Sequence, residues 1–284
     1  MDYKAPWIKN PQILKLGLSG YNNNWLKQYD LPHLKGEYKK QIRKKNIFLS
    51  KCPNIKKDVF FASKNLFSFS EKLQEIILKQ NNITSTNINS NSHPLFSVSL
   101  KIAEDLIIFR RNNFGKWIFS AGCLFFPSHW KLKEKKFKDL STIHNPVPEY
   151  NSKLSIPVNR FFENMQLNLT SFRRNWTLQI DDNLYSPVRI NTIITPDQVL
   201  RKIFCREEYQ TFRKIINEDI IVFTIRTHMT PLNYWIKDEY NCLNLIKTLK
   251  KFSSKFRRYR GVNNYENALI EWYNKNFKKN FKIK

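Results

Sequence analysis

The chain has 284 residues, 41% of them hydrophobic and 14% aromatic, which is enough to build a core and excludes a globally disordered protein. It contains no continuous apolar run long enough to cross a bilayer, so a membrane-spanning helix is not expected. The net charge of +26 would suit a polyanion such as nucleic acid. Lys is spread over the whole chain, however, and accompanies abundant Asn, Ile and Phe, so we interpret most of the charge as compositional.

The cysteines and the first residues indicate a reducing compartment. The four cysteines lie far apart with no CxxC pair, a spacing that fits neither a zinc site nor an iron–sulfur cluster. The segment MDYKAPWIKN at the N-terminus lacks the apolar stretch of a secretory signal. We therefore expect buried free thiols and a cytoplasmic protein.

The first third of the chain shows little regular periodicity. Residues 1–33 are rich in Trp, Tyr, Asn and Pro and are predicted to form an extended wrap with a short helix. Residues 34–47 predict a basic surface helix. The pattern Ser68-Phe-Ser-Glu71 is typical of a capping box and predicts a helix over 69–80. The polar, Asn-rich segment 81–93 is predicted to be a loop.

The middle of the chain predicts a sheet. Asn112-Asn-Phe-Gly115 separates two β-rich runs and is typical of a four-residue hairpin loop. The strands are predicted at 105–111, 116–126, 174–180, 200–212 and 220–227. The last of these is almost entirely apolar and is therefore expected to be central.

Helices are predicted on both sides of these strands. They cover residues 131–138, 152–165, 240–252 and 265–277, where apolar residues recur with helical spacing. The predicted fold class is thus α+β, with an antiparallel five-stranded sheet and flanking helices. Only six glycines are present, and neither GxGxxG nor GxxxxGK[ST] occurs, so the chain shows no fingerprint for its own nicotinamide, flavin or ATP site.

An unusual block of aromatic, Pro and His residues points to a site. It comprises CLFFPSHW at 123–130, followed by His144-Asn-Pro-Val-Pro148. The prolines hold the backbone beside His144 stiffly, and a single rigid imidazole suits a haem axial ligand better than zinc, which needs three or four ligands. The alternative is a turn histidine bonded to the backbone.

Polar residues on the predicted strands form a second set of candidates. Arg206, Glu208 and Gln210 share one face of their strand, as a solvated face or as a polar network in a cavity. Arg226 could pair with Glu208 across the sheet, leaving either a structural ion pair or a carboxylate for a cationic amine. Arg174, if it points inward, needs a partner or a bound anion; otherwise it forms a surface ion pair.

Several motifs, in order along nearly the whole chain, carry a resemblance to a known family. They are Glu104-Asp-Leu106, Phe126-Pro-Ser-His-Trp130, Ile143-His-Asn-Pro-Val-Pro148, Arg160-Phe-Phe162, Arg174-Asn-Trp176, Arg206-x-Glu208-x-Gln210, Phe223-Thr-Ile-Arg-Thr227 and Tyr259-Arg-Gly261. With these motifs the chain resembles the α-subunit of haem-dependent oxidative N-demethylase, formerly a domain of unknown function (DUF3445).

The resemblance implies a fold and a domain organisation. The core would be PAS-like and haem-binding, spanning 96–236. Residues 1–95 would form an N-terminal helical and extended wrap with the Asn-rich loop, and 237–284 would form C-terminal helices packing on the core. All three segments would make one structural unit.

The resemblance also implies a reaction and its cofactors. The substrate would be a small methylated amine such as dimethylamine, demethylated with O₂ to give formaldehyde. Haem b would be the cofactor. Electrons would come from NADPH through a separate flavin and iron–sulfur reductase, which would be the protein partner, and no membrane or nucleic-acid partner is implied.

The resemblance assigns roles to residues of this chain. His144 would be the proximal haem ligand, because it is the only histidine inside a family motif position; His129 and His228 stand where the family more often has other residues. Arg174, Trp176, Glu208 and Arg226 would be the polar distal or haem-propionate residues. Trp130 and Arg174 would contact the cofactor.

The sequence also departs from the family pattern. Cys123 lies three residues before Phe126, Ile215-Ile216 replaces the usual Leu-Pro, and the insert at 81–93 is atypical. These departures leave the substrate open. Two other functions remain: a haem-binding PAS-type sensor without turnover, and a basic nucleic-acid-binding protein, which would show steep salt dependence and no haem spectrum.

Overall fold

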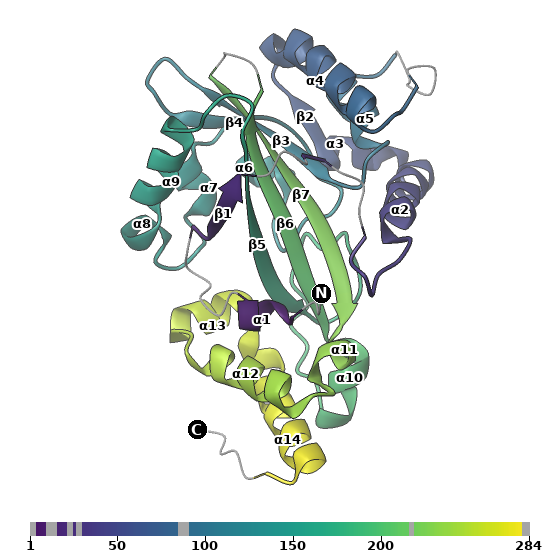
Figure 1. Ribbon diagram of the computed structural model, residues 1–284, viewed down its shortest axis with the longest axis vertical. Coiled ribbons are helices and arrows are strands. Elements are labelled where there is room, and N and C mark those ends of the chain that lie inside the picture. The colour runs from purple at the N-terminus through teal and green to yellow at the C-terminus, as the bar shows by residue number, and fades with distance from the viewer. Residues whose placement is uncertain are drawn as a thin grey trace.

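The computed structural model describes residues 4–9, 16–21, 25–26, 30–84, 91–215 and 219–279. Within these residues, an antiparallel sheet of seven strands runs through the centre in the order β1-β5-β6-β7-β3-β4-β2 (Figure 1). The strands are β1 (Leu18–Tyr21), β2 (Phe60–Ala62), β3 (Asp105–Arg111), β4 (Trp117–Cys123), β5 (Thr170–Gln179), β6 (Phe204–Lys214) and β7 (Ile220–Pro231).

The five-stranded prediction was wrong in number. The five predicted segments fall on β3 to β7, and the short β1 and β2 extend the two edges of the sheet. Strands of four and three residues are too short to show the alternation that a sequence pattern needs. The predicted strand 200–212 also differs at its start, since Val199–Lys202 is the short helix α10 and β6 begins at Phe204.

Helices cover both faces and one end of the sheet. They are α1 (Pro6–Lys9), α2 (Glu37–Lys51), α3 (Lys56–Val59), α4 (Phe67–Gln80), α5 (Pro94–Ser99), α6 (Leu132–Lys135), α7 (Leu140–His144), α8 (Tyr150–Lys153), α9 (Ser155–Glu163), α10 (Val199–Lys202), α11 (Leu232–Ile236), α12 (Glu239–Lys250), α13 (Ser254–Arg260) and α14 (Glu266–Phe277). In Figure 1, α2 to α5 lie on one side of the sheet, α7 to α9 on the other, and α10 to α14 at the bottom.

The alternation of side chains along β3 explains this layering. Leu106 and Ile108 point into a cluster formed with α4 and α5, while Ile107 and Phe109 point into a cluster formed with α7 and α9. Successive strand residues face opposite sides, and here both sides are covered. The strand therefore reads as a continuous apolar run rather than an alternating one.

A third apolar cluster attaches the C-terminal helices to the sheet. Leu245 of α12 and Leu269 of α14 pack together with Trp235, and all three are buried. Trp7 of α1 joins the same cluster, with its ring 5.7 Å from that of Trp176 on β5. The last helices therefore pack against residues from both the beginning and the middle of the chain.

A buried ion pair ties α2 to the turn after β4. Lys45 Nζ lies 3.3 Å from Asp105 Oδ1, and both side chains are 0% exposed. The two carboxylate oxygens of Asp105 accept hydrogen bonds from the backbone N–H groups of Phe125 and Phe126, at 3.0 and 2.8 Å. This contact fixes the backbone of the CLFFPSHW block.

Local predictions can be compared residue by residue. The hairpin loop at 112–115 is confirmed, with Asn112 N–H donating to Lys116 O at 2.9 Å and Gly115 at φ 75°. The capping box was wrong: α4 begins at Phe67 with Leu66 at its N-cap, so Ser68 lies inside the helix. Cys52 is exposed rather than buried. Residues 85–90 of the Asn-rich segment lie outside the described residues.

Candidate functional site

A cavity of about 570 Å³ lies between the sheet and the helices α7, α8 and α9. That volume is within the range of ligand and cofactor pockets. The strands β3 to β7 contribute mainly every second residue, from the face of the sheet that meets the cavity. The segments 126–135 and 187–189 and the helix α13 complete the wall. The cavity is therefore enclosed by segments that are far apart in the sequence.

His144 lies on the helical wall, at the end of α7. Its Nδ1–H donates to Leu140 O at 2.7 Å, because a carbonyl oxygen can only accept. That bond fixes the tautomer and leaves Nε2 as the nitrogen with a lone pair. Desolvation is the main cause that lowers the pKa of His144 to about 4, so the ring is neutral near pH 7. The ring also stacks on Tyr150, with centroids 4.4 Å apart.

Most of the remaining wall near His144 is apolar. Phe109, Phe162 and Phe212 line the cavity, and the Phe162 ring contacts each of the other two edge to face. Trp130 lines it too, with Lys135 Nζ 5.3 Å from its ring centroid. Lys135 also donates to Ile143 O, and burial lowers the pKa of its ammonium to about 8. The neutral imidazole of His144 therefore stands beside a mainly apolar, aromatic wall.

A polar network crosses the sheet wall on β5 and β6. Glu208 accepts from Arg206 Nε at 3.3 Å, from Gln210 Nε2 at 2.8 Å and from Asn175 Nδ2 at 3.5 Å. The prediction that Arg206, Glu208 and Gln210 share one face is confirmed, and they form a network in a cavity rather than a solvated face. The Arg206 side chain is 0% exposed and that of Glu208 12%.

Three further arginines line the cavity. They are Arg173, Arg189 and Arg260, and none of them forms an ion pair with a carboxylate in the described part of the chain. Arg260 Nη1 donates to Trp176 O at 3.2 Å, while its Nε is buried without a hydrogen-bond partner among the described residues. Desolvation lowers the pKa of all three guanidinium groups. Half-buried guanidinium groups without a carboxylate partner can bind an anion.

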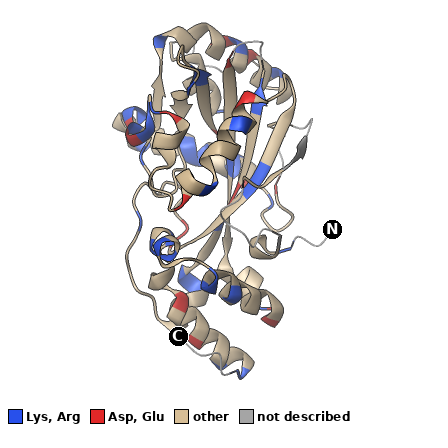
Figure 2. Ribbon diagram, turned by 90° about the vertical axis from the view of Figure 1, so that its left-hand side faces the viewer, with Lys and Arg blue, Asp and Glu red and all other residues tan. Residues whose placement is uncertain are grey.

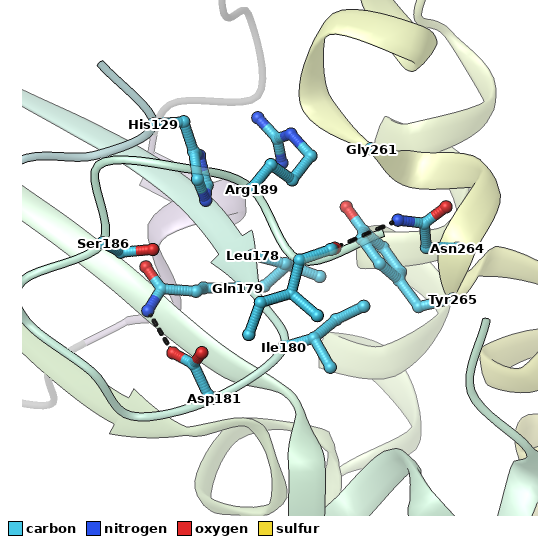
Figure 3. Close-up of a pocket in the computed structure, with 11 residues that line it drawn as sticks. His129, Leu178, Gln179, Ile180, Asp181, Ser186, Arg189, Gly261, Asn264 and Tyr265 are labelled. Carbon is cyan, nitrogen blue, oxygen red and sulfur yellow. Dashed lines mark hydrogen bonds between the residues drawn. The ribbon is translucent and has the colours of Figure 1, made fainter. Parts of the chain in front are cut away.

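His129 lines the cavity as well, although the family pattern made it a poor candidate for the haem ligand. It has φ 61°, uncommon for a non-glycine residue, and desolvation, followed by the charges of Arg189, Arg206 and Arg260, lowers its pKa to about 3. The ring also borders a small polar pocket with Gln179 and Ser186 (Figure 3). That pocket is about 10 Å³, close to the size of one water molecule.

The predicted residues are not all brought together. His144, Trp130 and Glu208 line the cavity. Arg174 points to the opposite face, where its Nη1 donates to Glu207 at 2.7 Å. Trp176 borders the cavity, but its ring packs in the third apolar cluster.

Arg226 is also turned away from the cavity, so the predicted Arg226–Glu208 pair was wrong. Glu208 faces Thr227 across the ladder, and Arg226 faces Tyr209, which places the Arg226 and Glu208 side chains on opposite faces. Arg226 instead donates to Gln41 Oε1 at 2.5 Å and lies 3.5 Å from Asp30.

The sequence contained one usable signal for the residues that were missed. Asn175 pairs with Glu208 across the β5–β6 ladder, so residues 173, 175 and 177 share the face of Glu208, and 174 and 176 do not. That conclusion requires the register, which the isolated pattern Arg173-Arg-Asn-Trp176 does not give. Arg189 lies in an irregular segment, where no periodicity could reveal it.

Charge and hydropathy add two facts. Lys and Arg occur on strands and helices from top to bottom of the molecule in Figure 2, not along a single element. In the described ranges no helix is long and apolar enough to cross a membrane, and no group of three or more His, Cys, Asp or Glu side chains is arranged to hold a metal ion.

Comparison with known families gives one match. The family described as haem-dependent oxidative N-demethylase, alpha subunit-like, matches residues 60–270. The matched range begins at β2 and ends within α14, so it includes every strand except β1 and all of the cavity wall except Leu16. The chain therefore belongs to the haem-dependent oxidative N-demethylase, alpha subunit-like family.

Proposed function

We propose that this protein binds haem b in the large cavity and uses it to demethylate a small secondary amine. The observation that carries the proposal is the arrangement of His144, whose Nδ1–H is bonded to Leu140 O and whose neutral ring stands in a largely aromatic cavity. A backbone carbonyl that orients an imidazole is a usual partner of metal-bound histidine. His144 would be the axial ligand.

The arginines that line the cavity fit the same group. Haem b carries two propionates, and Arg173, Arg189 and Arg260 supply cationic donors that lack a carboxylate of their own in the described residues. The buried Arg260 Nε is a donor with no partner there. A bound dicarboxylate would neutralise these charges and accept their hydrogen bonds.

The network around Glu208 would bind the substrate. A dimethylammonium ion needs a carboxylate or an aromatic face, and Glu208 is the cavity carboxylate that Asn175 and Gln210 hold in place. Arg206 pairs with it at 3.3 Å. The enclosing aromatic side chains would exclude bulk water.

Bound haem would supply O₂ activation, and the overall reaction would convert dimethylamine, O₂, NADPH and a proton into methylamine, formaldehyde, NADP⁺ and water. The electrons would reach the cavity from a separate flavin and iron–sulfur reductase, consistent with a family named as an alpha subunit. The five long strands β3 to β7 with their flanking helices would form the PAS-like, haem-binding core at 96–236. Residues 1–95 and 237–284 would pack around it as one unit.

Ultraviolet–visible spectroscopy of the full chain after haem reconstitution tests the ligand. We expect a Soret band that shifts on reduction, is lost or displaced in His144→Ala, and persists in the control His93→Ala, which removes a histidine outside the cavity. Loss in His129→Ala with retention in His144→Ala would transfer the ligand role to His129. Absence of a specific Soret band would refute the proposal, and steep salt-dependent binding to DNA or RNA would then favour the nucleic-acid function.

Turnover separates an enzyme from a sensor. With haem bound, dimethylamine, O₂ and a chemical reductant should yield formaldehyde, and Glu208→Gln should raise the amine concentration needed for half-maximal rate. A haem protein that shows neither formaldehyde nor an amine-dependent spectral shift would be a sensor or carrier.

A further inference from the structure

The cavity has a mouth that can be located from residues that both line it and reach solvent. Val188 is 61% exposed and Tyr259 36% exposed, and both line the cavity. Arg189 joins the two segments by donating to the backbone oxygens of Tyr259 and Arg260, both at 2.9 Å. Lys131 and Glu134 line the cavity from the segment 131–138, and both are exposed. The mouth therefore lies between residues 131–138 and α13.

Both segments that border the mouth are strongly basic. The sequence KLKEKKFK at 131–138 contains five lysines and one acidic residue, and Lys133, Lys136 and Lys138 are exposed. On the other side α13 has the sequence SKFRRYR, in which Lys255 and Arg258 are exposed. Cationic side chains thus flank an apolar centre.

This arrangement of residues is typical of a protein-docking site. Interfaces commonly place aromatic and aliphatic residues at the centre and polar residues at the rim, and complementary charge on the rim accelerates encounter and orients the partner. Electron transfer falls steeply with distance, so a donor to a group in this cavity must dock near its mouth. An acidic donor matches both requirements.

We propose that the mouth of the cavity, flanked by residues 131–138 and α13, is the docking surface for an acidic electron-transfer protein. The proposal rests on the proposed function, because it supplies the electrons that demethylation consumes. A second basic surface exists on α2, where Lys39 and Lys44 are exposed. That helix covers the opposite face of the sheet (Figure 1), so a donor bound there would be separated from the cavity by the sheet.

Two charge-reversal variants test the proposal. Lys133→Glu/Lys136→Glu alters the mouth, and Lys39→Glu/Lys44→Glu alters α2; each lowers the net charge by the same four units, so a general charge effect is shared. The probe is an acidic plant-type [2Fe–2S] ferredoxin, and its dissociation constant is measured at two ionic strengths with the full chain, before and after haem loading.

We expect the mouth variant to weaken binding about tenfold more than the α2 variant at low salt, with the difference shrinking at high salt. Equal weakening by both variants, stronger weakening by the α2 variant, or no ferredoxin binding to the unaltered chain at low salt would each overturn the proposal. Binding is measured without turnover, so a failure here is distinguishable from a failure to bind haem. Circular dichroism confirms that both variants are folded.

Discussion

The buried pair Lys45–Asp105 allows a prediction of stability that can be worked from contacts. Replacing Lys45 by Met removes the ammonium 3.3 Å from Asp105 Oδ1 and leaves a carboxylate that is 0% exposed. The N–H groups of Phe125 and Phe126 still support that carboxylate, but the compensating charge is lost. Breaking a buried pair from one side costs about 3–5 kcal/mol, a large part of the roughly 5–15 kcal/mol that stabilises a typical protein.

The measurement is a double-mutant cycle by urea unfolding, followed by tryptophan fluorescence. Lys45→Met and Asp105→Asn should each lower the free energy of unfolding, and the double variant should lower it by at least about 2 kcal/mol less than the sum, because the two single variants each strand a charge. The control Lys44→Met, at the exposed neighbouring position on α2, should change it by less than about 0.5 kcal/mol. A cost below about 1 kcal/mol for Lys45→Met with no coupling would refute this reasoning.

Three further predictions concern the cavity. Because the pKa of His144 in the folded chain is lowered to about 4, the unfolded chain takes up a proton first as pH falls below about 6.5, and the free energy of unfolding declines by about 3 kcal/mol between pH 6.5 and 4. Denaturation at pH 7 and at pH 4.5 should show that the free energy of unfolding of His144→Gln depends less on pH than that of the unaltered chain. An unchanged pH dependence in the variant would contradict the lowered pKa. Glu208→Gln should lower the free energy of unfolding of the haem-free chain by about 3 kcal/mol in urea, because it leaves the Arg206 guanidinium without its carboxylate partner. An unchanged urea midpoint would show that Arg206 needs no counter-charge. Gly261→Ala should lower the melting temperature by several degrees, because Gly261 has φ 65° and its added Cβ would lie 2.9 Å from Arg189 Nη1; an unaltered melting temperature would mean that Arg189 moves freely.

The long strands could be predicted because their patterns are local. The boundaries of β3 agree with the run Asp105–Arg111, and the hairpin loop at 112–115 is encoded by Asn112 and Gly115. The edge strands β1 and β2 depend on pairing with β5 and β4. Their short sequences carry no independent signal, and so the strand count was underestimated.

In the candidate site, too, the features set by local sequence could be predicted, and those set by strand pairing could not. Arg206, Glu208 and Gln210 could be placed on one face because alternation within a single strand is a local property. On the neighbouring strand β5, the sequence prediction placed the wrong residues on the cavity face. Arg173, Arg174 and Asn175 are all polar, so the pattern does not show which face of β5 meets the cavity. One face meets the cavity and the other meets Glu207. Only the ladder that pairs Asn175 with Glu208 resolves which is which.

His144 and the arginines show why a motif can locate a site without giving its composition. The Pro-rich turn after His144 marks a rigid imidazole in sequence, and the structure adds the Leu140 carbonyl that orients it. The arginines that line the cavity are Arg173 on β5, Arg189 in the segment before α10 and Arg260 on α13. These three segments are far apart in the sequence and meet only in the folded chain. Each arginine alone predicts a surface side chain. Together, with Arg260 Nε lacking a partner in the described residues, they make the cavity a candidate site for an anionic ligand, which only the folded arrangement reveals.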